Sequence, residues 1–279
     1  MVGGKRTRHL IGYLFCLFLP LTAWGTQYRP WLGNFGEFEW RNAMRFQTYH
    51  HLLKGNQAKP YASDDLFLES SLAATIFNYQ LEFEVVGANT RRQSGIDHLK
   101  LTGRNLILDD INGDPLSLAA GISLIQTFSP GLHDPSAFHH GYTEAEIFLS
   151  FGKEFYDESS YEVDWKSRVW ALIGMGTSFD RGSPWQNVIL AYEQSFKLNH
   201  RVKVFTNALY GDGSRRFHFQ DFKGYGSVQH ASVDVGIRYT YLIDFFGNAS
   251  LEYTNRVYSY NFPSQVSQIT LQVLYSFGL

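Results

Sequence analysis

The chain has 279 residues, enough for one large domain or two small ones. Its mean hydropathy of -0.22 excludes a bundle of membrane helices, and its single cysteine, Cys16, excludes a disulfide framework and a multi-cysteine metal site. The formal net charge of -2 gives no reason to expect nucleic acid as a partner. Aromatic residues make up 16% of the chain, a composition rich in strand-forming side chains.

The first 25 residues predict a secretory signal peptide. A basic start (Lys5, Arg6, Arg8) precedes the apolar run Leu10–Thr22, and Ala23-Trp24-Gly25 places small residues where a signal peptidase reads. The alternative is a membrane anchor helix, but the run is shorter than the roughly 20 residues that a span needs. We therefore expect cleavage after Gly25 and a single cysteine-free domain over residues 26–279.

The first predicted strand is Phe35–His50, which alternates with a period of two. One face is apolar and the other is polar: Phe38, Trp40, Met44 and Phe46 against Glu39, Arg41, Arg45 and Gln47. Gly55–Asp65 is polar and turn-rich. Leu66–Val86 is long for one strand, and its first half is out of phase with its second. That segment therefore contains either a β-bulge or two strands.

The same alternation recurs along the remainder of the chain. The further expected strands are 98–108, 116–128, 142–155, 161–177, 188–197, 201–211, 228–245, 249–260 and 267–279. These make about eleven strand segments, most of them about ten to 16 residues long. Strands of soluble sandwiches have about five or six residues, whereas tilted membrane strands have about nine to eleven. Strand length therefore favours a membrane barrel.

The connections between these strands alternate in length. Short ones lie at Asn112, Asp157, Asn199 and Gly247, and longer ones lie near Pro130, Gly182, Gly213 and Pro263. Outer-membrane barrels have short periplasmic turns and longer external loops. Both termini then lie on the periplasmic side, which requires an even number of strands. We expect twelve, within a range of about ten to 14, with the missing strand between Thr26 and Leu72.

The C-terminal stretch Ser267–Leu279 alternates apolar with mostly polar residues and ends in aromatics. It resembles the closing strand of Gram-negative outer-membrane β-barrels, in which a terminal Phe is read by the barrel-assembly machinery. Here the terminal residue is Leu279, with Phe277 two places earlier. The resemblance is to the superfamily and names no functional family. It implies an all-β fold, a closed antiparallel transmembrane barrel, inserted by that machinery and surrounded by outer-membrane lipid and lipopolysaccharide.

In a membrane barrel the apolar face meets lipid and the polar face lines the lumen, whereas a soluble β-protein has the opposite arrangement. The expected membrane-facing residues are Trp40, Phe46, Phe77, Tyr79, Phe83, Val235, Ile237, Tyr253, Val273, Tyr275 and Phe277. The expected pore-lining residues are Arg41, Arg45, Glu82, Glu84, Lys100, Arg104, Glu144, Glu146, Lys166, Arg168, Asp234, Arg238, Glu252 and Arg256. Opposite charges on this face either pair within the wall or line a water-filled path.

His230, Ser232 and Asp234 share one face of a predicted strand. The His-x-Ser pair resembles that of outer-membrane phospholipase A and the lipid A deacylases, in which imidazole activates a hydroxyl. The phospholipase follows its serine with Asn-Gly, whereas this chain has Val233-Asp234. Because the alternate residues form the lipid-facing set, we expect His230 and Ser232 to line the lumen, with catalysis as the alternative.

The other candidate binding residues are expected in loops. His133, His139 and His140 either contact a metal or are solvated loop residues, and we adopt the second interpretation. No zinc-type spacing exists, so no metal or other cofactor is predicted. Arg215, Arg216 and Lys223 fall in the longest polar insertion, 212–227, where they either contact lipopolysaccharide phosphates or are solvated.

The sequence therefore predicts an exported outer-membrane β-barrel. Its expected role is passive passage of small polar solutes or a structural place in the envelope. Twelve strands enclose an interior narrower than that of general porins, which have 16 to 18. The rival classes are a barrel lipid hydrolase that uses His230 and Ser232, and a soluble periplasmic β-protein.

Overall fold

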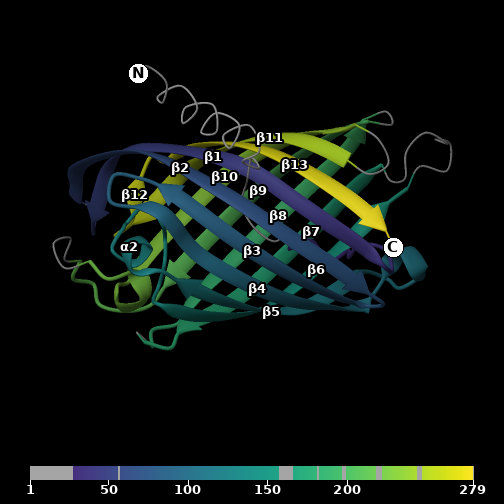
Figure 1. The fold of residues 1–279 in the computed structure, drawn as a ribbon, viewed down its shortest axis with the longest axis horizontal. Coiled ribbons are helices and arrows are strands. Elements are labelled where there is room, and N and C mark those ends of the chain that lie inside the picture. Colours follow the sequence, from purple (N-terminus) through teal and green to yellow (C-terminus); the bar gives the residue numbers. More distant parts are fainter. Residues whose placement is uncertain are drawn as a thin grey trace, which may run out of the picture.

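The computed structural model describes residues 28–55, 57–156, 166–180, 182–196, 199–217, 222–243 and 247–278. Over these residues the chain forms a closed antiparallel barrel of twelve strands. Figure 1 shows their arrangement. The barrel strands are β1 (Glu37–Lys54), β2 (Gln57–Ile76), β3 (Tyr79–Asn89), β4 (Ser94–Leu108), β5 (Ser117–Thr127), β6 (Thr143–Phe155), β7 (Ser167–Ser178), β8 (Trp185–Phe196), β9 (His200–Gly211), β10 (His230–Leu242), β11 (Gly247–Tyr260) and β13 (Ser267–Gly278). In these segments no helix is both long and apolar enough to cross a membrane.

The barrel closes where the first and last long strands meet. Each strand pairs with its neighbour in the chain, and β13 pairs with both β11 and β1, from Glu37 opposite Gly278 to Thr48 opposite Ser267. Closure pairs the backbone groups of the long strands on both sides, so no long sheet edge is left open among the described residues. A membrane interior requires such pairing. The predicted closing role of the C-terminal stretch is confirmed.

The predicted count of twelve strands is confirmed, and the additional strand is β2, most of which lies within the expected interval between Thr26 and Leu72. Leu66–Val86 contains the two-residue turn Phe77-Asn78, which separates β2 from β3, and Phe77 adopts a left-handed φ of 53°. Gly55–Asp65 is not an extended turn region, because β2 already begins at Gln57. In this part of the strand, Tyr61, Ser63 and Asp65 point inward. Both the inner and the outer face here carry mostly polar residues, so the apolar–polar alternation that marks a strand is weak.

The two faces of the wall differ in polarity in the sense expected for a membrane barrel. In β6, Glu146 and Ser150 are buried inside, whereas Ile147 and Leu149 are exposed outside. All eleven predicted membrane-facing side chains are exposed, from 39% for Phe277 to 73% for Phe77. An apolar outer face around a polar interior is the reverse of a soluble β-protein.

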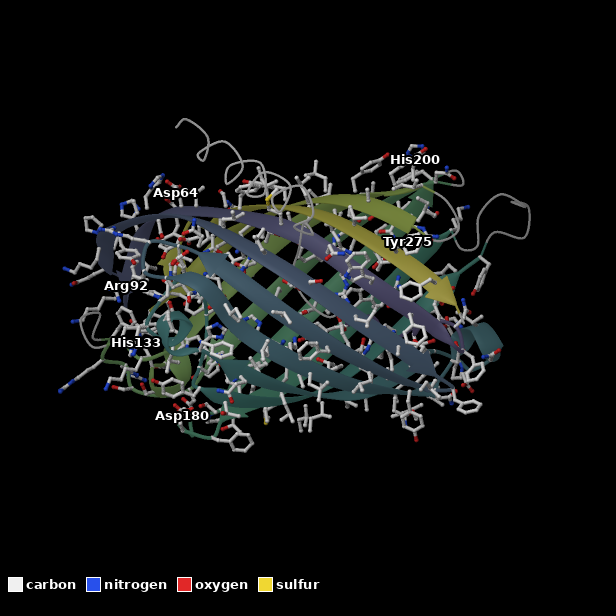
Figure 2. The ribbon with its side chains drawn as sticks, in the orientation of Figure 1. Asp64, Arg92, His133, Asp180, His200 and Tyr275 are labelled. Carbon is white, nitrogen blue, oxygen red and sulfur yellow. The ribbon has the colours of Figure 1, made fainter. Side chains whose placement is uncertain are left out.

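The barrel has two dissimilar ends. The loop end holds the helical turn α2 (Ser129–Leu132), η2 (Tyr225–Ser227) and the two-residue strand β12 (Pro263–Ser264), which pairs with β1. The turn end holds η1 (Asp110–Asn112) and the end of β13. Figure 2 labels Arg92, His133 and Asp180 at the loop end, and His200 and Tyr275 at the turn end.

The expected alternation of connection lengths holds only in part. At the turn end, residues 109–116 form the connection that was predicted to be short, in which Gly113 has a left-handed φ of 104° and ends η1. Its eight residues exceed the four of the loop-end connection 90–93. At the loop end, residues 128–142 form a longer connection between β5 and β6. The predicted short connection at Asp157 lies outside the described residues.

Candidate functional site

The barrel encloses a cavity of about 1250 Å³. It borders Ile111 and Tyr156 at the turn end and Phe138 and His139 at the loop end, so it extends along most of the barrel. This volume is larger than that of ordinary small-molecule pockets, roughly 300–1000 Å³. The interior is therefore a candidate path as well as a candidate binding site.

Most of the predicted pore-lining side chains border this cavity. Those that do are Arg45, Glu84, Lys100, Glu144, Glu146, Arg168, Asp234, Arg238, Glu252 and Arg256. Arg41, Glu82 and Arg104 are buried on the inner face but do not border it. Lys166 precedes β7, is exposed, and does not border the cavity.

Opposite charges on the inner face pair with one another. Asp234 accepts two hydrogen bonds from Arg256, at 2.7 and 2.9 Å. Further ion pairs join neighbouring or nearby strands: Arg238 with Glu252 at 2.7 Å, Arg41 with Glu82, and Arg168 with Glu154. Pairing of this kind stiffens the wall and reduces the net field inside the barrel.

The segment before the first strand enters the barrel, except for Asn34 and Phe35, which are exposed. In this segment, which we call the lead-in (residues 28–36), Trp31 is buried and its indole N–H donates to Asp110 Oδ1 at 2.9 Å. Trp31 packs in a cluster with Phe148 and Trp170. Tyr28 accepts a hydrogen bond from Lys100 Nζ at 2.5 Å. The sequence indicated only a short connection here, and the lead-in instead occupies part of the lumen from the turn end.

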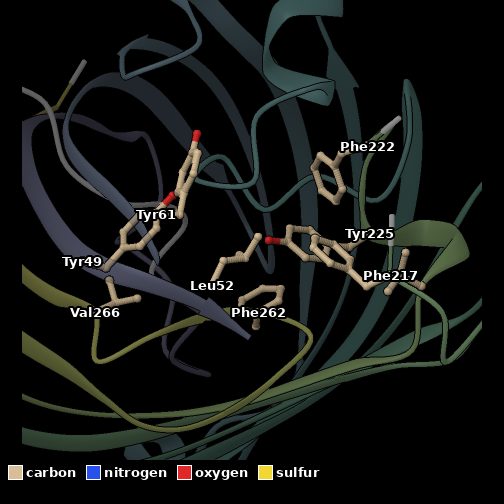
Figure 3. Close-up of a cluster of buried hydrophobic side chains, with 9 residues drawn as sticks. Tyr49, Leu52, Tyr61, Phe217, Phe222, Tyr225, Phe262 and Val266 are labelled. Carbon is tan, nitrogen blue, oxygen red and sulfur yellow. The ribbon is translucent and has the colours of Figure 1, made fainter. Parts of the chain in front are cut away.

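Aromatic and aliphatic side chains close the loop end. This aromatic cluster, shown in Figure 3, contains Tyr49, Leu52, Tyr61, Phe217, Phe222, Tyr225, Val228, Phe262 and Val266. The composition of 212–227 predicts a polar insertion, whereas Phe217, Phe222 and Tyr225 of this segment fold inward and pack on the ends of β1 and β2. The basic residues of the same segment, Arg215, Arg216 and Lys223, are exposed, as a solvated or lipopolysaccharide-contacting role requires.

The residues of the hydrolase hypothesis do not form a triad. His230 Nδ1 donates to the carbonyl oxygen of Val228 at 2.7 Å, and its Nε2 lies 3.2 Å from Nε2 of His140. Asp234 is engaged with Arg256 instead of orienting the imidazole. Ser232 shares the inner face, is 3% exposed and is therefore turned away from lipid. The hydrolase alternative is not favoured.

The loop histidines were expected to be solvated, and two of them are buried. His139 and His140 are 6% and 5% exposed, because the connection 128–142 folds into the barrel. Glu144 holds this connection by accepting hydrogen bonds from the backbone and the ring of His140, at 2.8 and 3.1 Å. His133 is half-buried and donates to the carbonyl oxygen of Phe222 at 2.8 Å.

No protein-family model matches the sequence, and no curated protein matches it. Solved structures match over most of the chain. An outer membrane channel from Pseudomonas putida F1 is similar over 92% of this chain and 100% of that channel, with 10% identity and a TM-score of 0.65. The NanC porin is similar over 85% of this chain and 98% of that porin, with 8% identity and a TM-score of 0.54. The fold is therefore that of outer-membrane β-barrel proteins.

Proposed function

We propose that this protein is a narrow outer-membrane channel for the passive passage of small polar solutes. The observation that carries the proposal is the charge-lined cavity of about 1250 Å³ inside a wall whose outer face is apolar. Two of the barrels it resembles are an outer membrane channel and a porin, which supports the same class.

The proposed path is constricted at two levels. The lead-in occupies the lumen around Trp31, and the aromatic cluster covers the cavity at Phe138 and Phe262. A solute must pass both constrictions, and the intervening wall presents paired charges of both signs. We therefore expect small solutes, a low conductance and weak preference between cations and anions.

The proposed location in the outer membrane implies a route of export and insertion. We infer that a signal peptide is cleaved after Gly25 and that the barrel-assembly machinery inserts the chain through β13. The eleven exposed side chains from Trp40 to Phe277 then meet lipid, and the loop end faces outward. There, exposed Arg215, Arg216 and Lys223 are placed to contact lipopolysaccharide phosphates.

Planar-bilayer recording of refolded protein tests the channel. We expect discrete conductance steps smaller than those of general porins, absent from heat-denatured protein and from detergent alone. The same recording is made on Phe262→Ala, which removes a central side chain of the aromatic cluster. If neither protein conducts although both are folded, the barrel is a closed envelope scaffold and the channel proposal is wrong.

A further inference from the structure

Two histidines from different parts of the chain point at one carboxylate oxygen. His98 Nδ1, from β4, lies 2.8 Å from Asp97 Oδ2, and His139 Nε2, from the connection 128–142, lies 2.8 Å from the same oxygen. The two rings meet edge to face with centroids 4.9 Å apart. One ligand atom from each of the three residues lies within 4.8 Å of the other two.

Each of these three side chains has a further polar group within 4 Å. Gln93 donates to Asp97 Oδ1 at 2.7 Å. On the far side of each imidazole stands a carboxylate, with Glu144 Oε1 3.8 Å from His139 Nδ1 and Glu84 Oε1 3.8 Å from His98 Nε2. Metal-binding histidines characteristically have such a carboxylate behind the ring, which fixes the tautomer and its orientation.

Neutral imidazoles alone leave this arrangement in conflict. A neutral imidazole has one N–H, so a ring that donates to Asp97 turns the lone pair of its other nitrogen toward Glu84 or Glu144. Protonation of the rings removes the conflict, and so does a metal ion beside Asp97. The near nitrogens then bind the ion through their lone pairs, and the far nitrogens donate their N–H groups to the two glutamates.

We propose that Asp97, His98 and His139 bind one divalent transition metal ion of the zinc class. Two imidazole nitrogens and one carboxylate oxygen form the three-ligand set typical of open zinc sites. Metal–ligand bonds of about 2.0 to 2.2 Å place tetrahedral ligand atoms roughly 3.3 Å apart, so the 2.8 Å contacts must widen by about half an ångström. His98 and His139 border the cavity, from which water reaches the fourth position.

The ion would join the barrel wall to the connection 128–142. Asp97 and His98 belong to β4, whereas His139 follows Phe138, whose ring stacks on Phe262 of the aromatic cluster at 4.9 Å between centroids. Binding therefore fixes the connection that carries part of the closure at the loop end. This goes beyond the channel proposal, since the site can bind metal whether or not the barrel conducts.

Calorimetric titration of the refolded, chelator-treated barrel with zinc chloride near pH 7.5 tests the site. We expect one ion per chain and at least a tenfold loss of affinity in His139→Gln and in Asp97→Asn. His133→Gln and His200→Gln are the matched controls, because both histidines lie outside the site, and we expect wild-type affinity in each. Shifted gel migration on heating verifies that every variant is folded.

Cobalt provides a readout that does not depend on stability. Co²⁺ bound to the wild-type chain should give visible ligand-field bands, which His98→Gln should abolish and His133→Gln should keep. Zinc should also raise the unfolding temperature of the wild type and leave that of Asp97→Asn unchanged. Absence of stoichiometric binding, or binding that survives both His139→Gln and Asp97→Asn, would overturn the proposal and assign the histidines as protonated partners of the carboxylates.

Discussion

Phe38 of β1 and Phe277 of β13 stack across the seam that closes the barrel, with ring centroids 5.6 Å apart and an interplanar angle of 12°. The two residues are also register partners in the β1–β13 ladder. Side-chain stacking and backbone pairing thus specify the same alignment of the first and last strands. A slip of one residue would exchange the inner and outer faces of β13, so this pair helps to fix which side chains face lipid.

Deletion of residues 269–279 should abolish insertion. The deletion removes the backbone partners of both β1 and β11 and exposes two strand edges. Heat-modifiable gel migration and protease resistance of the membrane fraction measure the outcome. Leu279→Phe, which keeps the strand, should insert as well as the wild type. A truncated chain that still inserts and shifts on heating would contradict the closing role of β13.

Adjacent residues of β11 test the two faces at one depth. Tyr253 is exposed on the outer face between its register partners Ile237 and Ile269. Tyr253→Lys should lower the free energy of unfolding by about 2–4 kcal/mol if that position lies near the bilayer midplane. Thr254 borders the cavity beside Glu252, and Thr254→Lys should fold and chiefly change ion selectivity. Urea titration in lipid vesicles measures both; equal destabilisation would show that the faces are wrongly assigned.

The sequence determined the architecture because alternation is a local signal. The period-two alternation in Glu144–Phe151 or Ile269–Phe277 indicates whether each side chain points to the inner or the outer face, independently of the partner strand. The split at Phe77-Asn78 was ambiguous, because neither residue is a glycine although Phe77 adopts a left-handed φ of 53°. The start of β2 was missed because apolar residues are sparse there and turn-forming residues accompany the polar ones.

The interior contacts could not be predicted, because they join residues far apart in the chain. Trp31 meets Asp110, and His139 meets Asp97, through connections that fold into the barrel. One signal was available in the sequence: Phe217, Phe222 and Tyr225 are aromatic residues within a segment otherwise rich in polar ones and glycine. Large apolar side chains in an external loop indicate that the loop packs against another part of the protein.

Replacing Phe262 by alanine should raise the conductance. Phe262 is 1% exposed and contacts Phe138 and Tyr225, with ring centroids 4.9 and 4.4 Å away, so its loss opens the aromatic cluster. The free energy of unfolding should fall by about 3–5 kcal/mol. Tyr258→Ala, on the outer face of β11 shortly before Phe262, should leave single-channel conductance unchanged. Identical conductance in wild type and Phe262→Ala would show that the cluster does not limit passage.

Asp110 should make the lead-in sensitive to acid. Burial by itself raises the pKa of this carboxyl, but hydrogen bonds from the Glu154 backbone, Ser117 and Trp31 outweigh it and hold the pKa below its ordinary value. Because the pKa is lower in the folded state, the ionised carboxylate stabilises the fold at pH values above the unfolded-state pKa of about 3.9. This contribution is lost as the pH falls through the lower, folded-state pKa.

Hydrogen exchange of the peptide covering 28–36 measures this effect. Exchange should accelerate in Asp110→Asn at neutral pH, and in the wild type only at strongly acidic pH. Asp64→Asn, at the opposite end of the barrel, is the control and should exchange at the wild-type rate. Unchanged protection of the lead-in in Asp110→Asn would mean that packing around Trp31 alone holds it in place.

The Asp234–Arg256 pair should couple wall stability to selectivity. Both side chains are buried, and the Arg256 guanidinium also lies 4.8 and 4.6 Å from the ring centroids of Phe138 and Phe262. Asp234→Asn should destabilise the barrel by about 3–5 kcal/mol, because it leaves a buried cation without its carboxylate. It should also move the reversal potential toward anion preference, since one negative charge beside the cavity is lost.

A double-mutant cycle separates the pair from its surroundings. Arg256→Met keeps much of the packing volume against the two rings and removes the charge, so Asp234→Asn should cost much less in that background than in the wild type. The expected coupling is about 0.5–3 kcal/mol by urea unfolding in vesicles. Additive effects would show that Arg256 acts through its aromatic contacts and not through Asp234. The shift in reversal potential should persist in that case, because it follows from the negative charge lost beside the cavity.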